Sequence, residues 1–344
     1  MSIEYRVLGL PGHDNALFVR LSTGQAIHRF LFDCGQGCID ALGRAEIQAI
    51  DHLLFSHFHI DHISGFDAFF RANYYRATQH NVVWGPPEAT EVMHARFQGF
   101  TWNLQEGTEV HWHVHAIHPG SIERTYADLG DGFTQPHVNR SLPYDGTLLD
   151  EEAYTLEAVH LDHGIPSIGY ILREKPHSNI DADALSSLGL KPGPWLQAIK
   201  RPSQAGERTL EVEGKLFPLG DLRKKLLKET PGESIAYLTD FVVAEEERKR
   251  LISFLRGCGT LVCEGTYRQD DAYLAERNLH LTSRQAAELA RDAGVQRLVL
   301  IHLSDRYTPD EWRALLKEAR DIFPAASFPE QWEALAGVAT GPGG

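Results

Sequence analysis

One short segment, residues 56–62, constrains this chain more than any other. It holds three histidines and one aspartate within six positions, directly after the apolar run 53–55. The pattern predicts a buried strand that ends in a tight, ligand-bearing loop. His57 and His59 point the same way in extended backbone, whereas the aspartate and the third histidine can point elsewhere. Imidazole and carboxylate groups without a thiolate suit Zn²⁺ or a similar divalent ion, so one loop could serve two adjacent metals.

A structural role for these histidines is the alternative. The chain has 18 histidines in 344 residues, so some crowding is expected by chance, and one histidine at a strand end is commonly structural. A His-x-His-x-Asp-His run straight after an apolar strand is much rarer. The pattern therefore favours a metal site.

Composition indicates an ordinary globular protein. Hydrophobic residues make up 42% of the chain and charged residues 23%, and 344 residues suffice for one large domain. Neither a secretory leader nor an apolar run of about 20 residues is present, which predicts a cytoplasmic chain without a membrane partner. The four cysteines match no strong zinc spacing and are expected to be reduced. The net charge of −14 argues mildly against nonspecific nucleic-acid binding.

Further polar candidates follow other apolar segments of the chain. Strands are expected near 3–10, 16–22, 28–32, 50–56, 155–161, 234–239, 260–264 and 297–301, and helices near 37–45, 88–97, 245–256, 282–293 and from 308. Polar residues lie at or just after the ends of several of these strands. Ligands at strand ends are what an α/β enzyme site requires.

These motifs resemble the metallo-β-lactamase superfamily. The metal loop and the Phe-Asp-Cys-Gly at 32–35 match its first motifs. The His-x-x-Pro-Ser-x-Gly-Tyr at 163–170 and the His-Leu-Ser-Asp-Arg-Tyr at 302–307 are similar to those of one branch, the ribonuclease Z group. The resemblance implies a four-layer αβ/βα sandwich forming a single domain over residues 1–344.

The resemblance also implies a ligand set and a reaction. One zinc would take His57, His59 and His163, and the other Asp61, His62 and His302, with Asp240 as the bridge. Asp33 would support the metal loop. Asp61 would also orient a hydroxide held between the two metal ions. These ions would be zinc, with Mn²⁺ or Fe²⁺ as the alternatives. His280, steered by Glu264, would protonate the leaving 3′-oxygen, unless it is only a residue at a helix start. The expected products are a tRNA 3′-hydroxyl and a trailer with a 5′-phosphate.

Residues 174–232 form an expected inserted arm. From 191 to 228 the chain has nine lysines or arginines and four acidic residues, a net of +5, so the rest sums to −19. The arm is similar to the Gly-Pro-containing flexible arm of ribonuclease Z, and its alternative is a solvated surface hairpin. Candidate substrate contacts, including one beyond the arm, are Lys191, Gly193, Pro194, Lys200, Arg201 and Arg306.

Several departures leave alternatives open. Residues 9–12 and 66–70 replace the family's Gly-Thr-Ser and Gly-Leu-Pro-Gly, and 119–150 is expected to be a loop or irregular excursion without a counterpart. His160 competes with His163, and the strand at 111–115 places three histidines on one face. The expected substrate is precursor tRNA and the expected state a homodimer. A phosphodiesterase for small or cyclic phosphodiesters, a β-lactam or thioester hydrolase, and a non-catalytic RNA-binding protein are the alternatives.

Overall fold

The computed structural model describes residues 2–200 and 209–336. Within that range the chain forms two compact units, each described by itself below. The first comprises residues 2–150, 155–173 and 234–336, and the second comprises Glu151–Tyr154 and Glu174–Glu233.

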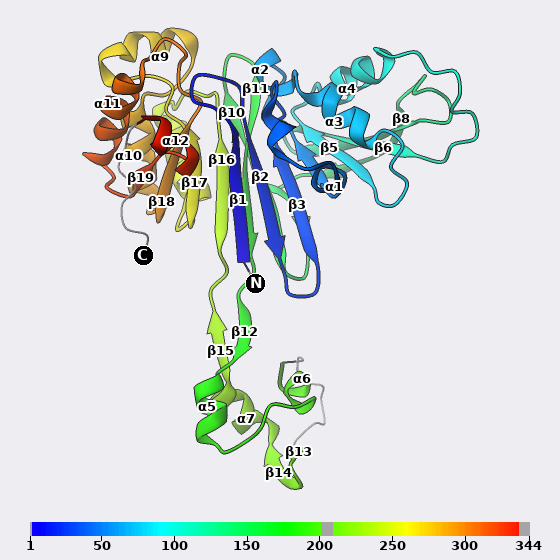
Figure 1. Ribbon diagram of the computed structural model, residues 1–344, viewed down its shortest axis with the longest axis vertical. Coiled ribbons are helices and arrows are strands. Elements are labelled where there is room, and N and C mark those ends of the chain that lie inside the picture. Colours follow the sequence, from blue (N-terminus) through cyan, green and yellow to red (C-terminus); the bar gives the residue numbers. More distant parts are fainter. Residues whose placement is uncertain (1, 201–208, 337–344) are drawn as a thin grey trace. The chain divides into compact units, whose positions relative to one another are not determined.

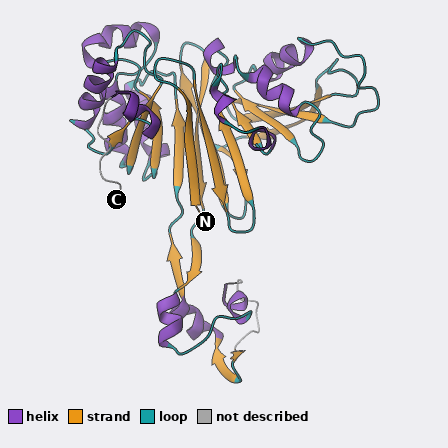
Figure 2. Ribbon diagram, in the orientation of Figure 1, coloured by secondary structure: helices purple, strands orange, loops and turns teal. Residues whose placement is uncertain are grey.

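The first unit is a four-layer αβ/βα sandwich built on two sheets (Figures 1 and 2). Its eight-stranded sheet runs in chain order: β1 (Ser2–Gly9), β2 (Asn15–Ser22), β3 (Ile27–Phe32), β4 (His52–Leu54), β5 (Asn81–Gly85), β6 (His111–His118), β7 (Ser121–Asp128) and β8 (His137–Pro143). The seven-stranded sheet runs β19 (Ala326–Ser327), β18 (Arg297–Ile301), β17 (Thr260–Glu264), β16 (Ser234–Leu238), β11 (Pro166–Glu174), β10 (Tyr154–Asp162) and β9 (Thr147–Asp150).

Aromatic side chains join the two sheets in the middle of the sandwich. Phe32 lies 5.6 Å from Tyr170 and 5.7 Å from Tyr237, measured between ring centroids. The Tyr170 hydroxyl is buried and donates to the carbonyl of Phe55 at 2.7 Å. Burial of such large rings supplies most of the favourable free energy of this contact.

Helices connect or follow the strands of both sheets. Those of the first sheet are α1 (Arg44–Gln48), α2 (Ile60–Ile63), α3 (Phe66–Asn73) and α4 (Ala89–Gln98), and those of the second are α8 (Glu245–Leu255), α9 (Ala272–Asn278), α10 (Ser283–Ala293), α11 (Pro309–Arg320) and α12 (Glu330–Ala336). The helices expected at 282–293 and from 308 are present, and each begins with a capping box, at Thr282 and Thr308. The helix expected at 37–45 is instead a short 3₁₀ turn (Cys38–Ala41) followed by α1.

The prediction of an irregular excursion at 119–150 was wrong, because this segment contains β7, β8 and β9. Pro119 and Gly120 form a two-residue turn between β6 and β7, with Gly120 at a φ of 81°. Such a turn signal marks a hairpin here and not the end of regular structure. The residues of β8 are largely exposed and polar, so this part of the segment resembled a loop.

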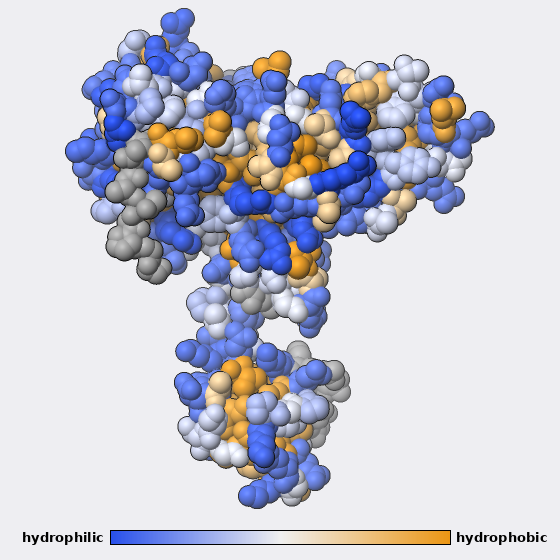
Figure 3. All heavy atoms as spheres, viewed as in Figure 1, coloured by the Kyte–Doolittle hydropathy of each residue, from blue (hydrophilic) through white to orange (hydrophobic). Residues whose placement is uncertain are grey.

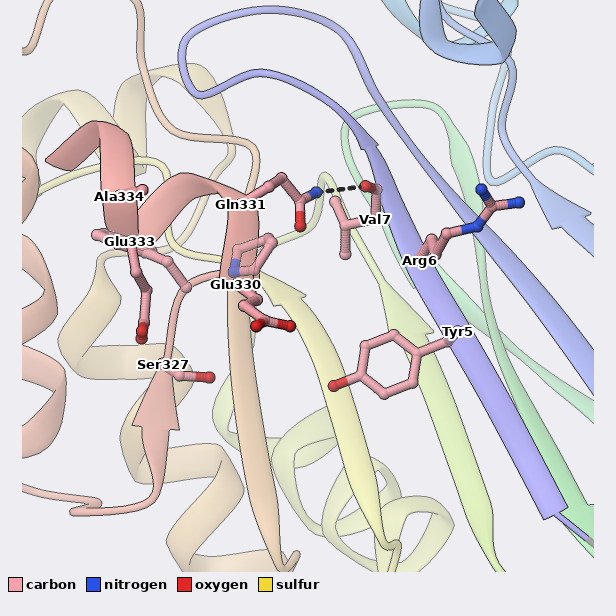
Figure 4. A pocket seen from close by; sticks show the side chains of 10 residues that line it. Tyr5, Arg6, Val7, Ser327, Glu330, Gln331, Glu333 and Ala334 are labelled. Carbon is pink, nitrogen blue, oxygen red and sulfur yellow. Dashed lines mark hydrogen bonds between the residues drawn. The ribbon is translucent and has the colours of Figure 1, made fainter. Parts of the chain in front are cut away.

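Helix α12 lies beside β1, where Gln331 Nε2 donates to the Val7 carbonyl at 2.6 Å (Figure 4). Tyr5 and Glu330 line the same pocket, which has a volume of about 820 Å³. None of its lining residues is a predicted metal ligand, so this pocket is separate from the candidate centre described below.

All four cysteines are buried and free, as the sequence predicted. Burial, together with the neighbouring carboxylates of Asp14 and Asp33, raises the pKa of Cys38 to about 12. A thiol with such a pKa is protonated at neutral pH, so it is neither a nucleophile nor a ready metal ligand.

The second unit has a small core of its own. Its elements are β12 (His177–Ile180), α5 (Ala182–Ser187), α6 (Trp195–Lys200), β13 (Thr209–Val212), β14 (Lys215–Pro218), α7 (Leu219–Leu226) and β15 (Leu227–Thr230). Leu185, Ile199, Leu222 and Leu226 are buried at its centre. Apolar residues also appear among the polar ones on its surface (Figure 3). The segment therefore holds more regular structure than its Pro-, Gly- and Lys-rich sequence suggests.

Candidate metal centre

Asp33 is the hydrogen-bonding centre beneath the metal loop. It is fully buried, follows β3 and has a positive φ of 58°. Its carboxylate accepts from the backbone N–H and the hydroxyl of Ser56, both at 2.7 Å, and from the Tyr237 hydroxyl at 2.8 Å. It also lies 2.8 Å from Nδ1 of His62. With Nδ1–H held by this carboxylate, the Nε2 lone pair of His62 faces the cluster, as metal ligation requires.

The predicted ligands converge at one end of the sandwich. Potential ligand atoms lie within 4.8 Å of one another in each of three overlapping groups. The groups are His57, His59, His163 and Asp240; Asp61, His62, Asp240 and His302; and Asp240, Glu264, His280 and His302. The first two groups have the membership expected from the sequence for two ions, and Asp240 belongs to all three.

Asp240 holds the central position through both carboxylate oxygens. Its Oδ2 lies 3.6 Å from His57 Nε2, 3.2 Å from His62 Nε2 and 3.7 Å from His163 Nε2. Its Oδ1 lies 3.4 Å from His302 Nδ1 and accepts from the Thr239 hydroxyl at 2.6 Å. Oδ2 therefore faces imidazoles of both ligand groups, which is the position of a bridging oxygen.

Backbone strain concentrates at this centre. Asp33, Asp240 and His302 have φ values of 58°, 51° and 54°, a region that residues other than glycine seldom adopt. The backbone N–H of His302 donates to the side chain of Asn15 at 2.9 Å, which helps to hold that conformation. Such strain persists where the surroundings enforce it, and it commonly accompanies a functional site.

The donor set fits two divalent cations. Nε2 of His57 is buried and has no hydrogen-bond partner within the described part of the chain, although it faces the cluster. Burial and the neighbouring His62 lower the pKa of His57 to about 2, so its imidazole is neutral and has a lone pair to give. Imidazoles and carboxylates, with no thiolate among them, are a set that zinc and similar ions accept.

His280 and Glu264 form a pair at the edge of the cluster. His280 Nδ1 lies 3.0 Å from Glu264 Oε2, which also accepts from the backbone N–H of Leu281 and from the Thr266 hydroxyl. Burial lowers the pKa of His280, but the Glu264 carboxylate more than offsets this and raises it to about 9. The Glu264 carboxylate thus favours the protonated form of His280, which can donate a proton.

Other predicted residues lie outside the cluster. The ring of His160 packs beside Tyr144 and is absent from the groups above, whereas His163 belongs to one of them. Arg306 is exposed in the loop after β18. Lys191, Gly193, Pro194 and Lys200 belong to the second unit, and Arg201 lies outside the described residues.

Sequence reasoning missed three supporting side chains: Asn15, Tyr237 and Thr239. Each is buried and hydrogen-bonds a residue of the cluster or Asp33. Tyr237 lies on β16 and Thr239 directly follows it, so their places just before Asp240 in the chain were the one available signal. Asn15 follows a turn, and its sequence context gave no signal of this role.

The three histidines at 111–115 lie on β6 and join none of the candidate metal groups found in residues 2–200 and 209–336. The ring of His115 packs edge-on against buried Trp84 with centroids 4.1 Å apart. Burial, with smaller contributions from Arg124 and His113, lowers the pKa of His115 to about 3. The interpretation of this segment as a strand therefore agrees with the structure.

Replacing His115 with phenylalanine should make the protein less sensitive to mild acid. Below about pH 6.5 the unfolded chain protonates this histidine, whereas the folded chain does so only near pH 3, so wild-type stability falls across that interval. The melting temperature of His115→Phe relative to wild type is expected to rise as the pH is lowered from 7.5 to 5. Circular dichroism melting curves measure this, and an equal difference at both pH values would contradict it.

No helix in the described ranges is both long and apolar enough to span a bilayer. Two family models match the chain: the β-lactamase superfamily domain over residues 226–303 and the anti-Pycsar protein Apyc1 over residues 13–175. Among solved structures, the metallo-β-lactamase fold protein YhfI from Bacillus subtilis is similar, with 16% identity and a TM-score of 0.55. The match covers 95% of this chain and 96% of YhfI, and it shows the fold.

Curated relatives extend over nearly the whole chain. Ribonuclease Z of Deinococcus radiodurans is 44% identical over 326 residues, which cover 95% of this chain and 97% of that protein. Ribonuclease Z of Oceanobacillus iheyensis is 28% identical, with 92% and 93% coverage. The chain therefore belongs to the ribonuclease Z family and is a metal-dependent endoribonuclease with the metallo-β-lactamase fold.

Proposed function

We propose that this protein removes 3′ trailers from precursor tRNA, with two zinc ions as its resident metals. The observation that carries the proposal is the 44% identity, over almost the full chain, to a protein named ribonuclease Z. The convergence of all seven predicted ligands in two groups that share Asp240 supports it. A homodimer in the cytoplasm is part of the same proposal, and its support is the family resemblance.

The ligand assignment follows the two groups. His57, His59 and His163 would hold one ion, Asp61, His62 and His302 the other, and Asp240 Oδ2 would lie between them. Bound there, the ions would activate a water molecule and stabilise the charge that develops on phosphorus in an in-line displacement. Mn²⁺ or Fe²⁺ could bind the same donor set, but zinc fits a set of imidazoles and carboxylates better.

Protein side chains supply the proton transfers and orientation. Asp61 Oδ2 lies 3.3 Å from His302 Nε2 and 3.4 Å from His62 Nε2, at the exposed side of the cluster, where it can orient the attacking water. His280, held by Glu264, donates its proton to the leaving 3′-oxygen. The phosphorus–oxygen bond breaks there, giving a tRNA 3′-hydroxyl and a trailer with a 5′-phosphate.

The second unit is proposed as the tRNA-binding arm. Lys191, Lys200 and the neighbouring Gly193 and Pro194, with Arg201 beyond the described residues, would contact the phosphate backbone. Arg306 would contact the substrate close to the metal centre. Support comes from the net charge of +5 over residues 191–228 of a chain with a net charge of −14. Such contacts predict strong salt dependence of tRNA cleavage.

Cleavage of a 3′-extended precursor tRNA by the zinc-loaded protein tests the proposal. We expect a single cut after the discriminator base, which Asp61→Ala abolishes. Deletion of residues 191–228 should abolish this cut but spare hydrolysis of bis(p-nitrophenyl) phosphate. No precursor cleavage by the wild type, with continued turnover of the small diester, would assign the metals to small phosphodiesters instead.

A further inference from the structure

An apolar pocket opens beside α3, the helix that follows the metal loop. Its volume is about 470 Å³, and its lining includes Phe70, Arg71, Tyr74, Phe100 and Trp102. Phe70 is buried at its base, while Tyr74 and Phe100 are 36% and 41% exposed. The segment 66–70, where the sequence departs from the family's Gly-Leu-Pro-Gly, therefore supplies part of this wall.

The aromatic rings that line the pocket are oriented at different angles to one another. The rings of Phe70 and Phe100 are stacked with centroids 5.6 Å apart, and those of Tyr74 and Trp102 lie 5.8 Å apart at 45°. Trp102 is fixed by a hydrogen bond from its indole N–H to the Phe97 carbonyl at 2.8 Å. The rings form a rigid, concave platform large enough for a planar aromatic group.

Charge at the rim favours an anionic ligand. Arg71 is exposed and makes no ion pair or hydrogen bond within the described residues. The acidic lining residue, Asp67, lies 3.7 Å from Arg96 on α4, so its charge is balanced. An unpaired guanidinium beside aromatic ring faces is the combination that binds an unpaired nucleotide, with the base on a ring and the phosphate at the cation.

The pocket lies close along the chain to the metal loop. Helix α3 begins at Phe66, three residues after the end of α2, which carries Asp61 and His62 (Figure 1). The helix that supplies part of the pocket lining is therefore the next helix after the metal loop.

We propose that this pocket binds an unpaired nucleotide of the 3′ trailer, with the base against Phe100 and Tyr74 and a phosphate at Arg71. This inference rests on the proposed function. The trailer is the favoured occupant because its bases are unpaired, whereas those of the acceptor stem are paired. The site would add affinity for longer trailers and would not take part in bond cleavage.

The first test measures binding of a fluorescein-labelled ten-nucleotide RNA by anisotropy. Phe100→Ala should weaken binding by about 5- to 100-fold, the range for loss of one base–aromatic stack. Arg71→Gln should weaken it less and reduce its salt dependence. Tyr75→Ala is the matched control, because Tyr75 is an exposed aromatic beside the pocket that does not line it. Unchanged binding by both pocket variants would overturn the inference.

The second test compares precursor tRNAs with trailers of one and ten nucleotides. The pocket variants should raise KM for the long trailer, leave KM for the short one unchanged, and leave bis(p-nitrophenyl) phosphate hydrolysis at the wild-type rate. An equal rise for both trailers would overturn the assignment to the trailer. If the wild type binds the decanucleotide through the pocket but does not cut precursor tRNA, the proposed function fails and the nucleotide site stands.

A second copy of the chain is the competing occupant of this surface. Leu104, 92% exposed in the same loop as Phe100 and Trp102, is a side chain that another copy could bury. Sedimentation velocity of Phe100→Ala and Leu104→Ala distinguishes an RNA occupant from a second copy of the chain. We expect both variants to keep the wild-type sedimentation coefficient. Dissociation of an oligomer by either variant would overturn the nucleotide assignment.

Discussion

Replacing Asp240 with asparagine is expected to abolish precursor cleavage and to lower the metal content below two ions per chain. Asparagine keeps the shape of the side chain but removes the charge that faces His57, His62 and His163. Loss of an outer hydrogen-bond partner of a ligand typically costs 10- to 100-fold in metal affinity or activity, and loss of a shared ligand should exceed about 100-fold. Metal analysis after gel filtration, together with initial rates, measures both effects.

Thr239 offers a graded control for this variant. Thr239→Val keeps the size of the side chain but removes the hydroxyl that fixes Asp240 Oδ1, so zinc affinity measured by chelator competition should fall by about 10- to 100-fold. Thr239→Ser should restore it. If Asp240→Asn still held two ions and cut at the wild-type rate, the bridging role of Asp240 would be wrong.

Replacing His280 with alanine should lower kcat for precursor cleavage by about 10²- to 10⁴-fold, the usual contribution of a general acid. The physical reason is loss of the proton that Glu264 keeps on this imidazole at neutral pH. The bound metal should remain at two ions per chain, because each of the two proposed ligand groups is complete without His280. Initial rates and metal analysis on one preparation give both quantities.

Metal content decides whether His280 is an acid or a ligand, since it also belongs to a third group with Asp240 and His302. A fall by one ion per chain in His280→Ala would make it a ligand. Glu264→Gln provides a comparison: it keeps a hydrogen-bond acceptor for Leu281 but removes the charge, so its kcat should fall with a smaller loss than in His280→Ala.

The metal loop could be predicted from sequence because its chemistry is local. Three histidines and an aspartate stand within six residues, and the strand before them fixes where they point. His163, Asp240 and His302 were predicted from their resemblance to the family's motifs, and their places at or near the ends of apolar strands supported that assignment. The structure brings these residues together, and the chemical role of each stays a prediction.

The supporting contacts could not be predicted in the same way. The hydrogen bond from Tyr237 to Asp33 joins residues 204 positions apart in the chain. A local sequence pattern cannot predict a contact between side chains of two different sheets. The strands at 119–150 were missed because polar edge strands and loops share a composition. The pocket beside α3 combines a helix with a loop near residue 100, and only the fold shows that their rings meet.

The centre draws its ligands from both halves of the sandwich. His57, His59, Asp61 and His62 follow a strand of the first sheet, whereas His163, Asp240 and His302 follow strands of the second. Ions held between them would act as a removable cross-link between the two sheets, joined from within by the Tyr237–Asp33 hydrogen bond. Because such binding favours the folded sandwich, removal of the ions would weaken the association of its two sheets.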